Sequence, residues 1–177
     1  TYHPPWAARI IAKIKPDFHV DISSTLFFST MLSAFIPVKF YDFRPANLKL
    51  SGLTSMPEDL TKLSFSTNSI QSLSCMHVVE HIGLGRYGDP IDPEGDLKAV
   101  TELKRVVAEG GNLIFVVPVG KPKIAYNAHR IYSYRQVMDM FSDFILKEYS
   151  LIPENALETG MIINASEEQT NKQNWGC

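Results

Sequence analysis

The run NLIFVVPV at residues 112–119 constrains the fold more than any other part of this chain. Its residues are apolar without the alternation of a strand that has one wet face, so it predicts a strand covered on both faces. A helix that starts near Asp92 precedes it and carries Leu97, Val100 and Leu103 on one side. A buried strand after such a helix is typical of a parallel sheet with helices packed on it.

The same alternation runs through most of the chain. We predict helices over 4–15, over 26–35, from 92 to the Gly110-Gly111 pair, and from a cap at Ser133. We predict further strands over 18–23, over 38–43, over 48–53, within 69–79, and over 144–152. The polar tail after residue 165 is predicted to be a loop. Strands that alternate with helices predict one α/β domain over residues 1–177, with a mainly parallel sheet and helices on both faces.

The composition and the charge of the chain exclude several classes of function. Hydrophobic residues make up 45% of the chain, enough for a single core. The net charge of −2 gives no positive field, so we expect no nucleic acid and no membrane as partners. Two cysteines without a CxxC pair exclude a disulfide framework and a zinc ribbon, and we expect a cytoplasmic protein.

Two short motifs have familiar spellings. Gly83, Gly85 and Gly88 spell GxGxxG, but two Asp-Pro pairs follow before any helix begins, so the pattern favours a loop over a dinucleotide fingerprint. The HVVEH segment, His77 to His81, is spelled like an inverted zincin, in which two histidines on a helix bind zinc. Only about one helical turn fits before the glycines, so we assign no metal ligands and keep a zinc site as the weakest alternative.

A third pattern is spread over several segments of the chain. An acidic residue follows the first strand, another ends the second, EDL stands at 58–60, and LSFSTNSIQSLSCMHVVEHI and VVAEGGNLIFVVPV follow. In this order the pieces resemble class I S-adenosylmethionine-dependent methyltransferases over roughly residues 18–150. The strings HVVEHIGLGRYGDPIDPEGDLKA, PVGKPKI and YNAHRIYSY are similar to a domain-of-unknown-function family at the edge of that superfamily. The resemblance implies a three-layer Rossmann-like fold.

The resemblance also implies where S-adenosylmethionine would bind. The turn after the first strand would hold its methionine part, the acid that ends the second strand its ribose hydroxyls, and an Asp before the fourth strand its adenine amino group. The residues assigned to the cofactor in this way are Asp21, Ser23, Ser24, Asp42, Phe43, Asp59, Leu60 and His77. The structural alternatives are that Asp42 pairs with Arg44 and that Asp59 caps a turn.

The sequence DISSTLFF departs from the glycine-rich turn that is usual after the first strand, where the backbone approaches the cofactor with positive φ. A second function therefore stays open. The chain could be a non-catalytic binding protein with the methyltransferase fold and a degenerate cofactor pocket.

Two polar loops, 83–95 and 121–130, follow the fourth and fifth strands, so we expect both at the same edge of the sheet. We assign His81 and His129 as catalytic bases, because imidazole can take a proton from a hydroxyl near neutral pH. The residues assigned to the acceptor are Glu80, Arg86, Tyr87, Asn127 and Arg130. They predict methyl transfer to a polar small molecule or a saccharide-like acceptor, with a structural ion pair between Glu80 and Arg130 as the alternative.

The resemblance finally implies an antiparallel last strand. It would begin near Trp175-Gly176-Cys177, unless residues 160–165 take its place. We expect this strand to be truncated at the C-terminus, and an exposed sheet edge there would allow contact between two copies in a homodimer.

Overall fold

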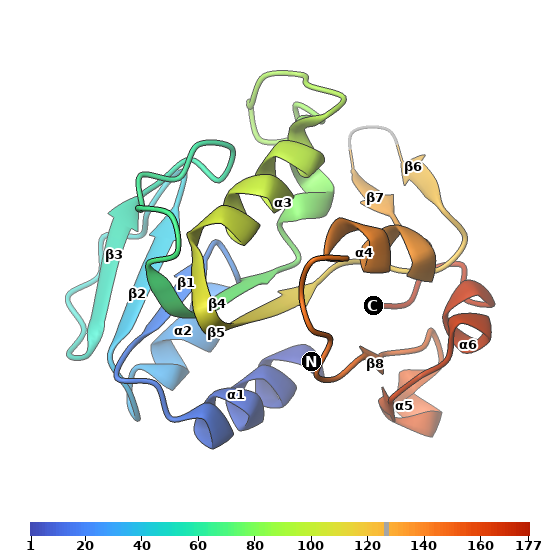
Figure 1. Cartoon of the computed structure of the whole chain (residues 1–177), viewed down its shortest axis with the longest axis horizontal. Helices are drawn as coiled ribbons and strands as arrows, with labels where there is room; N and C mark the ends of the chain where they lie inside the picture. Colours follow the sequence, from blue (N-terminus) through green and yellow to red (C-terminus); the bar gives the residue numbers. More distant parts are fainter. Residues whose placement is uncertain (126–127) are drawn as a thin grey trace.

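The computed structural model describes residues 1–125 and 128–177 and confirms the α/β fold. Its centre is a sheet of five parallel strands in the order β3-β2-β1-β4-β5 (Figure 1). These are β1 His19–Ile22, β2 Val38–Asp42, β3 Leu53–Pro57, β4 Ile70–Met76 and β5 Val107–Val116. Because β2 lies on one side of β1 and β4 on the other, the β1–β4 boundary is the switch point, where open α/β sheets bind ligands.

Helices cover both faces of the sheet (Figure 1). The four that do so are α1 His3–Ile14, α2 Leu26–Leu32, α3 Gly95–Val106 and α4 Tyr134–Met140. Phe40 and Ile114 belong to the apolar cluster that contains residues of α1 and α2. Leu73 and Leu103 belong to the larger cluster of the opposite face, with residues of α3 and α4. The two clusters make the three-layer arrangement that the resemblance implies.

Smaller elements complete the chain. They are the 3-10 turn η1 Val79–His81, the strands β6 Lys123–Ala125, β7 His129–Ile131, β8 Ser150–Leu151 and β9 Ile162–Ile163, and the helices α5 Ala156–Thr159 and α6 Glu167–Asn171. β6 pairs with β7 and β8 with β9, both antiparallel. β7 also lies against η1, which brings the second predicted polar loop to the end of β4.

The prediction that Gly110-Gly111 ends the third helix is wrong. α3 ends at Val106, and the chain passes directly into β5, which contains both glycines. The register between β4 and β5 is irregular at this point. A Cβ on Gly111 would lie 2.8 Å from the carbonyl oxygen of Ala108, so the pair forms a bulge that requires glycine.

Other element boundaries also differ. β3 begins at Leu53, where the predicted strand ended, and of the predicted strand over 144–152 only Ser150 and Leu151 form a strand, β8. The tail predicted as a loop contains α6. There the Ser166 hydroxyl accepts the N–H of Gln169, and the Gln169 side chain accepts the N–H of Ser166, which is a capping box. The same device begins α4 at Ser133, as predicted.

The last residues lie between two other segments. Gly176 exchanges two backbone hydrogen bonds of 2.8 Å with Val119, in antiparallel orientation, and Cys177 exchanges two with Ile152. An antiparallel contact therefore forms near Trp175, whereas residues 162–163 pair with β8.

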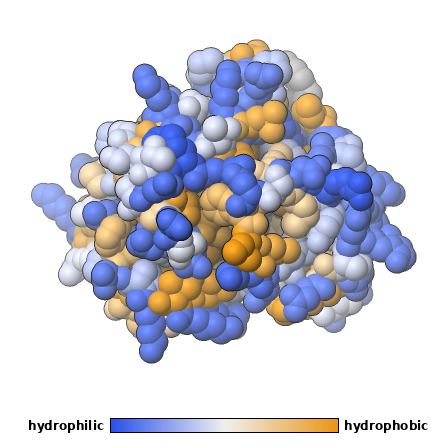
Figure 2. Space-filling model, in the orientation of Figure 1, coloured by the Kyte–Doolittle hydropathy of each residue, from blue (hydrophilic) through white to orange (hydrophobic). Residues whose placement is uncertain are grey.

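No helix in the described part of the chain is both long and apolar enough to cross a membrane. Figure 2 shows hydrophobic surface in the lower centre of the view, over α1 and over the segment from α4 to β8. Ile145 and Leu146 of that segment are exposed.

Candidate active site

The predicted site residues that the structure describes lie at or after the carboxyl ends of β1, β2, β3 and β4, and on β7, which lies against η1. The turn after β1 has the backbone geometry of a glycine turn without a glycine, because Ser23 has a φ of 53°. Its N–H and its hydroxyl donate to the carbonyl oxygen of Tyr41, at 2.7 and 3.3 Å. The Ser23 side chain is therefore turned toward β2.

Ser24 lies across the switch point. Its buried hydroxyl accepts the backbone N–H of Met76, 3.0 Å away, and so joins the end of β1 to the end of β4. The side chain therefore lies at the switch point between these strands, where open α/β sheets bind ligands.

Asp21 is fully buried on β1. Its carboxylate oxygens accept the hydroxyls of Ser29 on α2 and Ser74 on β4. Burial raises the pKa of Asp21 to about 6, although hydrogen bonds from Ser24, Ser29 and Ser74 act in the opposite direction. This position differs from the predicted contact with the methionine part of the cofactor, since Asp21 holds β1 to α2 and β4 from below.

His19 extends this buried network. Its ring nitrogens lie 2.8 Å from the hydroxyls of Ser72 and Ser74. The Ser74 hydroxyl donates to Asp21, so we assign the His19 proton to Nε2, which donates to Ser74. Burial lowers the pKa of His19 to about 3, and the ring is neutral.

Asp42 ends β2 and is half-buried. Its Oδ1 accepts the backbone N–H of Arg44 at 2.7 Å, and the described residues give no hydrogen bond to Oδ2. Asp42 therefore pairs with Arg44, as the structural alternative predicts, but with its backbone N–H and not with its guanidinium. The neighbouring Phe43 is 67% exposed and offers its ring to the same edge.

Asp59 and Leu60 follow β3. The Oδ1 atom of Asp59 accepts the N–H and the hydroxyl of Thr61, at 2.8 and 2.7 Å, so Asp59 caps a turn as its structural alternative predicts. Leu60 is buried in the larger core cluster, whereas the prediction placed it in contact with the cofactor.

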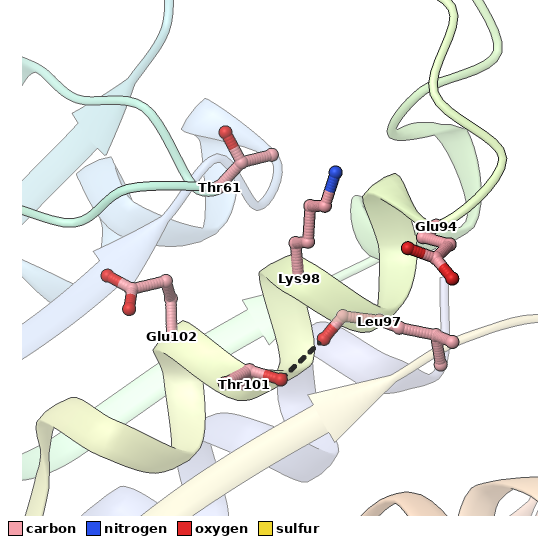
Figure 3. A pocket seen from close by; sticks show the side chains of 6 residues that line it. All are labelled: Thr61, Glu94, Leu97, Lys98, Thr101 and Glu102. Carbon is pink, nitrogen blue, oxygen red and sulfur yellow. Dashed lines mark hydrogen bonds between the residues drawn. The ribbon is translucent and has the colours of Figure 1, made fainter.

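A pocket lies beside this turn, between Thr61 and the outer face of α3 (Figure 3). Lys98 pairs with Asp92 at 2.6 Å, and Glu102 accepts the N–H of Leu63 at 2.8 Å. These side chains already have partners that join α3 to its neighbouring loops, so the pocket is a solvated groove and we place no site there.

His77 follows β4 in a left-handed conformation, with a φ of 60°. Its Nδ1 lies 3.0 Å from Oε1 of Glu80. Burial lowers the pKa of His77, but hydrogen bonds to Cys177 and Glu80 outweigh it and raise the pKa to about 9, so the ring is cationic at neutral pH. His3 packs edge-on to His77, with 4.7 Å between ring centres, and burial lowers the pKa of His3 to about 4.

Glu80 is the buried carboxylate of this edge, at 1% exposure. Its Oε1 faces His77, while Oε2 is buried without a hydrogen-bond partner among the described residues. The predicted alternative of an ion pair with Arg130 is wrong, because Arg130 pairs with Asp96. An unpartnered buried oxygen is costly, so Oε2 is an open acceptor for a hydroxyl, an amine or water.

His81 has one nitrogen held and one free. Its Nδ1 lies 2.6 Å from the carbonyl oxygen of Ala128, which can only accept, so Nδ1 carries a proton. Its Nε2 lies 3.9 Å from Oε1 of Glu80, too far for a hydrogen bond. With the proton at Nδ1, the lone pair that can accept a proton is at Nε2, and a carboxylate lies nearby, an arrangement that suits a general base.

His129 lies edge-on to His81, with 6.2 Å between ring centres, and stacks on Trp175 at 5.3 Å and 23°. Burial lowers the pKa of His129, and the neighbouring His81 adds to this effect. Of the remaining acceptor predictions, Arg86 and Tyr87 are exposed in the loop 83–94, and Asn127 lies outside the described residues.

Asp89 organises the loop after η1. Its carboxylate accepts the N–H groups of Gly83, Gly85 and Tyr87, which together outweigh partial burial and lower its pKa. A Cβ on Gly83 would lie 2.0 Å from the carbonyl oxygen of Asp92. The glycines bend a loop, and no helix follows them directly, so no dinucleotide fingerprint is formed.

Arg130 is 5% exposed and supports the loop from below. Its guanidinium donates to the carbonyl oxygens of Ile82 at 2.6 Å and Pro93 at 3.3 Å, and its Nε lies 3.4 Å from Asp96. The Tyr132 hydroxyl donates to the same carboxylate at 2.9 Å. Arg130 thus fixes both ends of the loop, which differs from the predicted contact with the acceptor.

The HVVEH segment does not form a helical pair of metal ligands. It spans the end of β4 and one 3-10 turn, and Ala128 occupies Nδ1 of His81. Within residues 1–125 and 128–177, no three His, Cys, Asp or Glu side chains are arranged to hold a metal ion. The zinc alternative therefore has no support in this part of the chain.

A comparison with protein families matches residues 49–175 to DUF268, described as a Caenorhabditis protein of unknown function. The match covers more than half of the chain and contains the loop 83–94, η1 and the β6–β7 pair. The chain belongs to the DUF268 family. The strings that carried the resemblance to a domain-of-unknown-function family lie in or overlap the matched segment, and that prediction is confirmed.

Solved structures show that this DUF268 chain has the class I methyltransferase fold. The MccD protein matches with a TM-score of 0.61 and 14% identity over 86% of this chain and 77% of its own. BH2331 of Bacillus halodurans, named as a candidate methyltransferase, matches with a TM-score of 0.60 and 12% identity over 94% and 80%. The [4+2]-cyclase SpnF matches with a TM-score of 0.58 and 12% identity over 83% and 59%. A cyclase with this fold means that the fold alone does not set the reaction. No curated protein matches the sequence.

Three parts of the site in this DUF268 chain were not predicted. His3 packs against His77 from α1, Trp175 stacks on His129, and the Ala128 carbonyl orients His81. Each joins residues that are distant along the chain, so no local pattern could reveal the contact.

Proposed function

We propose that the chain binds S-adenosylmethionine across the ends of β1 and β2 and transfers its methyl group to a hydroxyl of a polar, saccharide-like small molecule. The observation that carries this proposal is that the turn after β1 is hydrogen-bonded to the end of β2, beside the carboxylate of Asp42. The left-handed turn at Ser23 is bonded to Tyr41, and the next residue, Asp42, keeps Oδ2 without a hydrogen bond among the described residues. A carboxylate in this place can accept both hydroxyls of a ribose.

The residues at this edge fit the cofactor. The backbone at Ser23 has the positive φ that a close approach to a ligand needs, and its hydroxyl is turned away toward Tyr41. Phe43 offers an exposed aromatic face for the adenine. Asp59 uses Oδ1 for its turn, so its other oxygen is the proposed acceptor for the adenine amino group.

His81 is the proposed general base. When bound, S-adenosylmethionine supplies an electrophilic methyl group, and the protein has to place and deprotonate the acceptor hydroxyl. His81, oriented by Ala128, takes the hydroxyl proton at Nε2. The carboxylate of Glu80, 3.9 Å from Nε2, stabilises the imidazolium that forms. His129, edge-on to His81, is the second proposed base.

A transfer assay tests this proposal, with S-adenosylmethionine that carries a tritiated methyl group and a set of neutral and acidic sugars. The wild-type protein should label at least one sugar. His81→Gln should lower the rate about 10²- to 10⁴-fold and leave cofactor affinity unchanged. Arg135→Gln, on the outer side of α4, should label like wild type. No labelled sugar with wild type, or full activity in His81→Gln, would contradict the proposal.

One observation favours a second candidate, a non-catalytic binding protein with the methyltransferase fold. The buried Ser24 side chain joins the ends of β1 and β4 at the switch point, where open α/β sheets bind ligands. In that case S-adenosylmethionine would not bind, while the loop residues would still hold a polar ligand. Calorimetry separates the two candidates, because only the enzyme should give a heat of cofactor binding.

A further inference from the structure

Two guanidinium groups from different elements lie close to the ring of Tyr87. The carbon at the centre of the Arg44 guanidinium lies 6.0 Å from the ring centre, and that of Arg86 lies 5.5 Å from it. Arg44 follows β2 and Arg86 belongs to the loop after η1. Tyr87 is 52% exposed, so this cluster of three residues is open to solvent at the edge that carries the proposed site.

Neither arginine has a carboxylate partner among residues 1–125 and 128–177. The side chain of Arg86 donates only to the carbonyl oxygen of Ala128, at 3.1 Å, and that of Arg44 has no ion pair in this part of the chain. Asp42 accepts the backbone N–H of Arg44 through Oδ1 but forms no ion pair with a guanidinium among the described residues. Asp89 accepts three backbone N–H groups. Two positive charges lie beside one ring, and an anion bound at this ring would be attracted by both.

The arginine cluster adjoins the proposed base. Arg86 and His81 donate to the same carbonyl oxygen, that of Ala128. The His81 ring is also edge-on to Tyr87, with 5.7 Å between ring centres. A group held by the arginines is therefore next to the residue that would deprotonate the acceptor.

We propose that Arg44 and Arg86 hold an anionic group of the acceptor, a phosphate or a carboxylate, beside Tyr87. This assignment rests on the proposed transfer to a saccharide-like acceptor. A guanidinium binds either anion through two parallel N–H donors. The Tyr87 ring adds a flat apolar face against which a sugar ring can pack. The acceptor is then an acidic or phosphorylated sugar whose free hydroxyl lies on the side of His81.

Calorimetry with three sugars of similar size tests the assignment: glucose 6-phosphate, glucuronate and glucose. At least one anionic sugar should bind wild type about tenfold more tightly than glucose. The double variant Arg44→Gln, Arg86→Gln should bind all three alike. Arg135→Gln removes an exposed arginine of α4 and should keep the preference. Circular dichroism should show that both variants are folded.

The outcomes are distinct. A preference for glucose 6-phosphate identifies a phosphate, and a preference for glucuronate identifies a carboxylate. Equal binding of the three sugars, no binding of either anionic sugar, or a preference that survives in the double variant would overturn the inference. Titration with S-adenosylmethionine is run separately. Cofactor binding without an anion preference removes only this inference, and a preference without cofactor binding removes the proposed methyl transfer instead.

Discussion

The Ser24 hydroxyl accepts the backbone N–H of Met76, 3.0 Å away, across the switch point between β1 and β4. Both groups are buried, so the serine satisfies a donor that a glycine in this turn would leave without a partner. The turn after β1 is therefore a structural connection between two strands as well as part of the proposed cofactor site.

Ser24→Ala should lower the free energy of unfolding by about 1 to 3 kcal/mol, because it leaves the Met76 N–H buried and unpaired. Urea denaturation measures this loss. Ser69→Ala is the matched control, since the Ser69 hydroxyl bonds a backbone carbonyl in an exposed turn, and it should cost less than about 0.5 kcal/mol. Equal losses in the two variants would contradict the structural role of Ser24.

Asp21 should make stability depend on pH. Its pKa of about 6 in the folded protein stands above its ordinary value of 3.8, so the folded state holds this proton more tightly than the unfolded chain. The resulting stabilisation is fully present below about pH 4 and is lost as the pH rises through about 6. The difference between the two pKa values corresponds to about 3 kcal/mol.

Asp21→Asn isolates this effect. The free energy of unfolding of the variant, relative to wild type, should rise by about 3 kcal/mol between about pH 4 and pH 7, as measured by urea denaturation. Burial lowers the pKa of His19, so the contribution of His19 to the pH dependence of stability has the opposite sign. His19 is present in both proteins, so its contribution largely cancels in the comparison. The exposed Asp17→Asn should show no such trend. A difference that does not change with pH would contradict the burial of Asp21.

Gly83→Ala should destabilise the protein more than Gly88→Ala. Both glycines have positive φ, 78° and 82°, so alanine adds about 1 to 2 kcal/mol of backbone strain at either place. At Gly83 the new Cβ would also lie 2.0 Å from the Asp92 carbonyl, whereas nothing lies within 4 Å at Gly88. We expect a loss of about 3 kcal/mol or more at Gly83 in thermal unfolding. Similar losses would contradict the closed form of the loop.

The fold could be predicted from local patterns where burial follows the sequence period. The apolar run that contains β5 and the one-sided helix α3 are examples. The double glycine misled the prediction, because it forms a bulge inside a strand and does not end a helix. α6 was missed although Ser166 and Gln169 spell a capping box, since its polar surface suggested a loop.

The site could be predicted where its residues are close in sequence and where the parallel sheet brings two loops to one edge. Glu80 lies within hydrogen-bond distance of His77, and His81 follows it, because the short turn η1 comes directly after the end of β4. The burial of Asp21 could not be foreseen, because it depends on hydroxyls of α2 and β4 that only the folded sheet brings together. The use of Arg130 as a loop support depends in the same way on Asp96 of α3.

Calorimetric titration with S-adenosylmethionine tests the central claim most directly. Wild type should bind in the micromolar range, and Asp42→Ala should weaken binding about tenfold to a hundredfold, because the variant loses the acceptor proposed for the ribose hydroxyls. Asp17→Ala, an exposed change before the amino end of β1 and so away from the carboxyl ends of the strands, should bind like wild type. No heat of binding with wild type, or equal affinity in Asp42→Ala, would contradict the account.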